Sequence, residues 1–163
     1  MQSIRIGFGY DVHALAPDRA LWLGGVRIEH SLGLQGHSDA DVLIHAICDA
    51  LLGAAGLRDI GYHFPDTAGR YKDIDSKILL RETMTLVRQA GYELGNIDAT
   101  VAAEQPKLNP HIPTMLATLA AVMQADPGDL SIKATTTERL GFTGRQEGIA
   151  AYATALIYKP RPH

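Results

Sequence analysis

Apolar residues occupy every second position at the start of the chain, between residues 3 and 10. Because successive side chains of a strand point to opposite faces, this alternation predicts a strand with one apolar face. The residues that share this face are Ile4, Ile6, Phe8 and Tyr10. We expect the strand to continue through Asp11-Val12-His13. Residues 20–28 form a second β region, where Gly24-Gly25 is typical of a hairpin turn.

A helical spacing of apolar residues begins after residues 36–41. Ser38, followed three positions later by Asp41, resembles a capping box and predicts the start of a helix with Ser38 as its N-cap. The apolar stripe runs along Leu43, Ile47, Leu51 and Ala54. A separate polar stripe at intervals of four residues contains Asp41, His45 and Asp49.

Two more helices and three more strands follow. Ser76 is the predicted N-cap of a helix that ends at Gly91, and a third helix is expected from about Pro113 to Gln124. The remaining strands are predicted at 96–104, 130–135 and 149–158. This order of elements lacks strict βαβ alternation, so it predicts a single α+β domain over residues 1–158. We expect a mixed or mostly antiparallel sheet with helices on one face, followed by a loose tail at 159–163.

Composition narrows the class of protein. The chain has 163 residues, 46% hydrophobic and 20% charged, with a net charge of −3 and no basic cluster, so neither nucleic acid nor a membrane surface is an expected partner. The single cysteine, Cys48, fits a reducing compartment and a buried structural thiol. No apolar run approaches the length of a membrane span, and the N-terminus begins as a strand rather than a signal peptide. We therefore expect a cytoplasmic protein.

Asp11 and His13 stand two apart on the first predicted strand, so their side chains project from one face. With His45 they would form the two-histidine, one-carboxylate set of an open zinc site, or of non-haem Fe(II). Asp41 or Asp49 would then accept the second ring N–H of a metal-bound histidine. Without a metal, Asp11 and His13 would be a surface pair at a strand end. Asp41, His45 and Asp49 would be a solvated polar face of the helix.

The stretch 133–145 carries threonines, glycines and Glu138, a pattern typical of loops that handle phosphate. Glu138 is a candidate ligand for Mg²⁺, Lys107 could neutralise a phosphate, and His37-Ser38 precede a helix N-terminus, where anions bind readily. The alternative for the threonines is an ordinary strand end. These residues point to metal-assisted phosphoryl chemistry.

The chain resembles the 2-C-methyl-D-erythritol 2,4-cyclodiphosphate synthase family nearly from end to end. The resemblance lies in ordered motifs at Gly9–His13, Gly36–Val42 with His45, Asp59–Gly61, Phe64–Thr67, Pro106–Leu108, Lys133–Glu138 and Leu140–Arg145. It implies a phosphorus–oxygen lyase of the non-mevalonate isoprenoid pathway. Such an enzyme would cyclise 4-diphosphocytidyl-2-C-methyl-D-erythritol 2-phosphate and release CMP.

The same resemblance implies roles for individual residues. Asp11, His13 and His45 would bind zinc, and Glu138 would hold Mg²⁺ or Mn²⁺ bridging the substrate diphosphate. His37 and Thr136 would donate hydrogen bonds in the transition state. The implied substrate contacts are Ser38, Asp59, Gly61, Phe64, Pro65, Asp66, Thr67, Ala68, Ala103, Pro106, Lys107, Leu108, Asn109, Thr135, Thr137, Phe142 and Arg145.

The family resemblance also implies a homotrimer with a chorismate-mutase-like fold and active sites between subunits. An isoprenoid diphosphate would occupy the central cavity near Arg145 and Glu147, where Gln146 replaces a common glycine. Two other functions remain open. One is a zinc phosphoesterase that uses water and releases inorganic phosphate, and the other is a non-catalytic trimer that keeps a nucleotide pocket.

Overall fold

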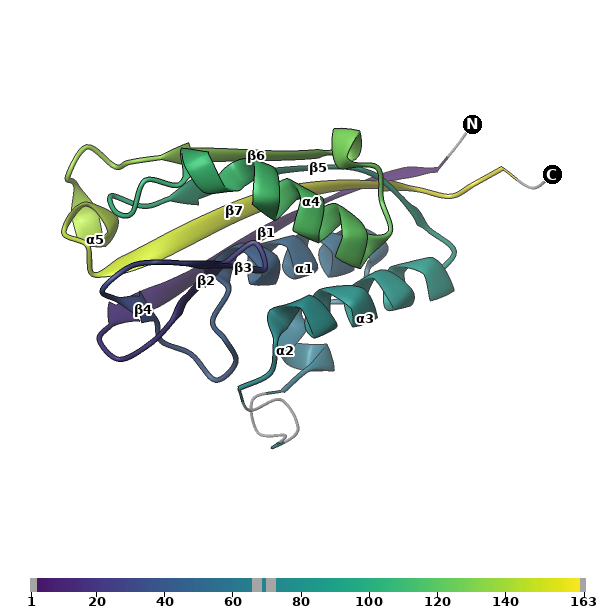
Figure 1. The fold of residues 1–163 in the computed structure, drawn as a ribbon. Helices are drawn as coiled ribbons and strands as arrows, with labels where there is room; N and C mark the ends of the chain where they lie inside the picture. Colours follow the sequence, from purple (N-terminus) through teal and green to yellow (C-terminus); the bar gives the residue numbers. More distant parts are fainter. Residues whose placement is uncertain (1–2, 66–68, 70–72, 162–163) are drawn as a thin grey trace.

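The computed structural model describes residues 3–65, 69 and 73–161 (Figure 1). Its elements in chain order are β1 Ile4–Ala16, β2 Leu21–Leu23, β3 Val26–Ile28, β4 Gly33–Leu34, α1 Val42–Ala55, α2 Ile60–His63, α3 Ser76–Gln89, β5 Glu93–Ala102, the 3₁₀ turn η2 Asn109–His111, α4 Ile112–Met123, the 3₁₀ turn η3 Pro127–Asp129, β6 Leu130–Thr135, α5 Gly141–Gly144 and β7 Gly148–Tyr158. Among the described residues, no helix is both long and apolar enough to cross a membrane.

The main sheet is mixed, as predicted. Over the described residues it has five strands in the order β4-β1-β7-β5-β6, of which β5 and β6 are parallel and the other neighbours antiparallel. The separate β2–β3 hairpin turns at Gly24 and Gly25, both with positive φ, which confirms that prediction. Helix α1 packs on β1 and β7, while α3 and α4 extend the helical layer (Figure 1). The structure is a single α+β domain.

Strand β1 has two different faces. The even positions predicted to be apolar do share one face, but this face is solvent-exposed, with Ile6 69% and Phe8 65% accessible. The odd positions face α1, and two of them are glycines. A Cβ on Gly7 would lie 1.9 Å from the carbonyl oxygen of Ala50, and one on Gly9 would lie 1.9 Å from that of Ala46. The helix therefore rests directly on the strand backbone.

The contact between α1 and β1 recurs along their length because the axial advance of two strand residues nearly equals that of four helix residues. Two residues of a strand advance about 6.8 Å, and four residues of a helix advance about 6 Å. Small residues on both elements therefore meet in successive pairs along their length. The next odd positions of β1 are Asp11 and His13, and the residue before Ala46 is His45. Close packing by the glycines thus brings the three predicted metal ligands to one end of the strand–helix contact.

The predicted helix starts were wrong in detail. Helix α1 begins at Val42 and its N-cap is Asp41, whose side chain accepts the N–H of Ile44. Helix α3 begins at Ser76 with Asp75 as N-cap. In both places an aspartate takes the cap in place of the predicted serine, Asp41 three residues after Ser38 and Asp75 directly before Ser76. A carboxylate is the stronger acceptor for the free N–H groups of a helix N-terminus.

Three short elements, β4, α2 and α5, lie where no strand or helix was predicted. Each is too short to show a periodic pattern. In α4, Leu119 and Met123 are buried, whereas Ile112 and Leu116 are only partly buried. Cys48 is fully buried, as expected of a structural thiol. At the tail, the backbone N–H of Lys159 donates to the carbonyl of Ser3, directly before β1, so the first residue of the predicted loose tail is hydrogen-bonded.

Candidate metal centre and active site

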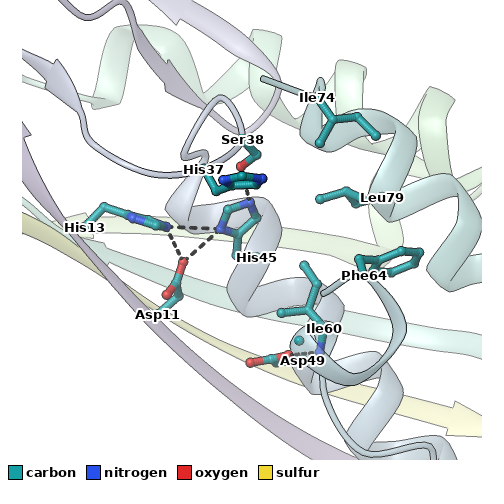
Figure 2. A pocket seen from close by; sticks show the side chains of 11 residues that line it. Asp11, His13, His37, Ser38, His45, Asp49, Ile60, Phe64, Ile74 and Leu79 are labelled. Carbon is teal, nitrogen blue, oxygen red and sulfur yellow. Dashed lines mark hydrogen bonds and ion pairs between the residues drawn. The ribbon is translucent and has the colours of Figure 1, made fainter. Parts of the chain in front are cut away.

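Three side-chain donor atoms converge at the end of the β1–α1 contact (Figure 2). Asp11 and His13 come from the odd face of β1, and His45 comes from the first turns of α1. Asp11 Oδ2 lies 3.0 Å from His13 Nε2 and 3.0 Å from His45 Nδ1. The two ring nitrogens are 3.2 Å apart. The strand and the helix therefore bring together the three residues that the sequence predicted as ligands.

The spacing of these atoms fits a tetrahedral metal ion. Zinc bonds of about 2.0–2.2 Å at tetrahedral angles place neighbouring ligand atoms about 3.3–3.5 Å apart. The three observed separations are 3.0, 3.0 and 3.2 Å, so the side chains need to open by only a few tenths of an ångström. Two nitrogens and one oxygen also leave a fourth position of the tetrahedron for a substrate atom. This donor set suits zinc and also Fe(II).

The protonation of His13 is set from outside the cluster. Its Nδ1 lies 2.9 Å from the carbonyl oxygen of Gln35. A carbonyl can only accept, so Nδ1 carries a proton. In the charged ring Nε2 donates to Asp11, and in the neutral ring Nε2 is bare and faces the cluster. The predicted acceptors were wrong: the Asp41 carboxylate receives backbone N–H groups of the hairpin and of α1, and Asp49 receives the N–H of Ile60.

The cluster also shifts the acidity of its members. Burial opposes ionisation of Asp11, but hydrogen bonds from His13 and His45 outweigh it and lower the pKa of Asp11 to about 2. Burial likewise acts to lower the pKa of His13, but the hydrogen bond to Asp11 and the charge of that carboxylate raise it. The Asp11 carboxylate is thus a preformed anion that attracts a positive charge, either a proton or a metal ion.

A pocket of about 200 Å³ opens beside the three ligands (Figure 2). It brings together several predicted site residues that are far apart in the sequence. Its wall is made by Asp11, His13, His37, Ser38, His45, Asp49, Ile60, Gly61, Phe64, Ile74 and Leu79. Asp59 does not line it but caps α2, where its side chain accepts the N–H of Tyr62. Pro65 follows Phe64, and the predicted contacts Asp66, Thr67 and Ala68 lie outside the described residues.

A second pocket of about 150 Å³ brings together several other predicted substrate contacts. Its lining consists of Ala103, Pro106, Lys107, Leu108, Asn109, Ala134, Thr135 and Thr136. Within the described parts of the chain, these residues include none that line the first pocket. In one copy of the chain, these two pockets are therefore lined separately.

The loop after β6 carries the predicted magnesium ligand. The Thr136 hydroxyl donates to the Glu138 carboxylate at 3.1 Å. Glu138 and Arg139 both have positive φ, at 54° and 64°, which is strained for residues with a side chain. The Glu104 carboxylate holds this conformation, because its Oε1 accepts the N–H groups of Thr137 and Arg139, each at 3.0 Å.

The sequence did not predict that Glu104 holds this loop. Its one visible signal was a carboxylate at the last position of the predicted strand 96–104, which alone says nothing of a distant loop. Two further predicted contacts, Phe142 and Arg145, lie in or just after α5 and line neither pocket described above. Arg145 instead forms a two-point ion pair with Glu147, at 2.8 and 3.1 Å.

The fold and the site together define an α+β enzyme domain with a candidate three-ligand metal centre at a pocket. The model of the YgbB family matches residues 4–158, nearly the whole chain, and the chain belongs to this family.

Named relatives make the family more specific. A protein of Parabacteroides distasonis called 2-C-methyl-D-erythritol 2,4-cyclodiphosphate synthase is 81% identical over 157 residues, covering 96% of this chain and 98% of its own length. Among solved structures, the bifunctional IspDF of Campylobacter jejuni is 43% identical with a TM-score of 0.94. That match covers 98% of this chain but 43% of the longer one. A CDP complex of IspF from Plasmodium falciparum is 34% identical, with a TM-score of 0.86 and 99% of each chain covered.

Proposed function

We propose that this chain is a 2-C-methyl-D-erythritol 2,4-cyclodiphosphate synthase of isoprenoid biosynthesis. Its substrate is 4-diphosphocytidyl-2-C-methyl-D-erythritol 2-phosphate. An oxygen of the 2-phosphate forms a bond to the β-phosphorus, the bond from that phosphorus to the oxygen bridging to the α-phosphorus breaks, and CMP leaves with this oxygen. The observation that carries the proposal is the convergence of Asp11, His13 and His45 at the wall of a pocket, in a chain whose relatives bear this name.

Asp11, His13 and His45 would hold zinc, and Glu138 would hold Mg²⁺ or Mn²⁺ against the substrate diphosphate. When bound, such ions supply positive charge that polarises the phosphoryl group and offsets charge on the attacking and leaving oxygens. The charge of Asp11 and the bare Nε2 of His13 make the protein side of this site ready for a cation.

The chain's other residues mainly have to hold the substrate in a folded pose, because the nucleophile is already part of the substrate. His37 and Ser38 line the pocket beside His45 (Figure 2), where an imidazole and a hydroxyl can donate to phosphate oxygens. Gly61 and Phe64 form the wall near α2 and are suited to the methylerythritol part, together with Asp59, Pro65 and the segment 66–68. No protein nucleophile is required.

The second pocket is proposed to hold the cytidine end. Backbone groups of residues 103–109 can read the edge of the base, and Lys107 can pair with a phosphate. Thr135 and Thr136 lie in the same wall, and Thr137 and Glu138 follow directly, so the nucleotide phosphates would meet the metal-binding loop. The likeness to a CDP complex of IspF supports a cytidine nucleotide as a ligand. Phe142 and Arg145 are proposed to contact the substrate from α5.

We further propose a homotrimer in which each active site combines the first pocket of one subunit with the second pocket of its neighbour. The separate linings of the two pockets support this arrangement. The exposed apolar face of β1, above all Ile6 and Phe8, supplies a surface for the contact. Phe8→Asp should convert a trimer into monomers in light scattering, whereas Asp18→Asn, a change outside this face, should leave the trimer intact.

An isoprenoid diphosphate is the proposed ligand of the trimer's central cavity, beside the Arg145–Glu147 pair. Gln146 has a φ of 59°, a conformation that glycine adopts most readily, so this position keeps the backbone of the common glycine. The single buried Cys48 agrees with a place in the reducing cytoplasm, which we propose as the location of the enzyme.

Phosphorus NMR of the purified protein with the diphosphocytidyl substrate and Mg²⁺ tests the reaction, with and without a zinc chelator. We expect CMP and a cyclic diphosphate, and loss of both with the chelator. His45→Ala should abolish turnover, while His30→Ala should not, because His30 lies outside both pockets. Release of inorganic phosphate would instead indicate a phosphoesterase. Nucleotide binding without any turnover would indicate a non-catalytic module.

A further inference from the structure

His45 has a second contact on the side of the ring away from Asp11. Its Nε2 lies 2.9 Å from the hydroxyl oxygen of Ser76, the first residue of α3. The Ser76 hydroxyl in turn donates to the carboxylate of Asp39, which also accepts the Ser76 backbone N–H at 2.9 Å. Ser76 is fully buried. A chain of hydrogen bonds therefore leads from the proposed metal centre to a carboxylate that lines neither pocket described above.

The direction of this chain follows from the number of protons available. An ionised carboxylate only accepts, and a serine hydroxyl has one hydrogen to donate. Because that hydrogen points to Asp39, the Ser76 oxygen must accept the N–H of His45 Nε2. A neutral His45 with its proton on Nε2 has its lone pair on Nδ1. This is the nitrogen that lies 3.0 Å from Asp11 Oδ2.

We propose that Asp39 and Ser76 are positioning residues that fix the tautomer and the ring orientation of His45 for metal binding. The Gln35 carbonyl does the same for His13 from the other side. When a metal ion replaces the protons shared with Asp11, both histidines would present bare nitrogens to it. Partners of this kind typically contribute about ten- to a hundredfold to metal affinity. The inference rests on the proposed metal site of the function described above.

A purely structural role for these residues has to be separated from the positioning role. Asp39 also accepts the N–H of Asp41, and its own N–H donates to Ile74. Removing its side chain would therefore disturb the start of both α1 and α3. Ser76→Ala is cleaner, because the backbone N–H to Asp39 remains and the N-cap of α3 is Asp75.

Ser38 offers a matched comparison on the same nitrogen. Its hydroxyl oxygen lies 3.2 Å from His45 Nε2 and accepts the N–H of Ala40. In the part of the chain that the structure describes, its hydroxyl has no recorded bond to a carboxylate, so it does not have the fixed direction of Ser76. We therefore expect Ser38→Ala to change zinc affinity less than Ser76→Ala.

The test uses the full chain in two measurements. Zinc affinity is measured by competition with a chromophoric chelator, and the His45 tautomer of the zinc-loaded protein is measured by long-range ¹H–¹⁵N NMR. Ser76→Ala should lower zinc affinity about ten- to a hundredfold and give a mixture of tautomers. Asp39→Asn keeps the size of the side chain but not its charge, and it should likewise lower zinc affinity and give a mixture of His45 tautomers. Ser31→Ala, at an exposed loop residue, serves as the control and should match the wild type.

The outcomes separate this inference from the proposed function. Failure of the wild-type protein to bind zinc would overturn the metal site itself. Wild-type affinity and a single tautomer in both Ser76→Ala and Asp39→Asn would overturn the positioning role and leave the metal site standing. A loss of affinity with an unchanged tautomer and a less stable zinc-free protein would also overturn it, since the effect would then be one of folding.

Discussion

Gly9→Ala tests whether close packing of α1 on β1 builds the metal centre. The added Cβ would lie 1.9 Å from the carbonyl oxygen of Ala46 and 2.7 Å from the backbone N of Ala50. Both atoms belong to the helix backbone, so no side-chain rotation can relieve the contact. Carbon and oxygen atoms in proteins rarely approach closer than about 3.3 Å, so the helix must move away by roughly 1 Å or more.

The size of the effect follows from what this movement changes. Overpacking of a core site costs about 1–3 kcal/mol, and we expect the upper end because rigid backbone meets rigid backbone. His45 directly precedes Ala46, so its Nδ1 would also move away from Asp11 and His13. Ligand atoms now 3.0–3.2 Å apart would no longer fit a tetrahedral ion. Zinc affinity should fall about tenfold or more, as expected when ligand placement is disturbed.

The assay is urea unfolding at fixed protein concentration, zinc-free and zinc-loaded, together with chelator competition. Gly53→Ala is the matched control, because Gly53 lies in the same helix and a Cβ there meets nothing within 4 Å. That control should gain about 0.5–1 kcal/mol from a better helix propensity and keep its zinc affinity. Wild-type stability and zinc affinity in Gly9→Ala would refute the packing argument.

Three further predictions concern residues outside the metal cluster. Glu104→Gln should speed hydrogen exchange of the Thr137 and Arg139 amides about tenfold at pH 7. Hydrogen bonds from the Arg139 and Thr137 N–H groups lower the pKa of Glu104 below its ordinary value of 4.5. The Glu104 carboxylate therefore stabilises the loop fully at any pH above 4.5. The difference between variant and wild type should disappear as the pH falls through the lowered pKa. Burial raises the pKa of the Cys48 thiol to about 12, so a disulfide reagent should label it only in denaturant. Asp41→Ala leaves buried backbone donors unpaired and should cost about 2–4 kcal/mol in urea unfolding; a loss below 1 kcal/mol would contradict this.

The metal ligands were predictable because regular elements carry them. Alternation places Asp11 and His13 on one face of a strand whatever packs against it, and the helical pattern around His45 is long. The pattern could not say which face of the strand would be covered. Apolar Ile6 and Phe8 would ordinarily mark the buried face, yet the helix covers the side with Gly7 and Gly9. Glycine carries no hydrophobic signal, so its packing role is visible only once the partner helix is in place.

The serines at the helix starts were misread for a related reason. The actual N-caps are aspartates near these serines, Asp41 three residues after Ser38 and Asp75 directly before Ser76. A hydroxyl at a helix start can bond either the helix backbone or another side chain, and local sequence cannot decide between them. Where a carboxylate takes the cap, the hydroxyl is released for a distant partner, and here both hydroxyls face His45 Nε2. A capping pattern with a spare acceptor is therefore a reason to look for a side chain that the extra hydroxyl orients.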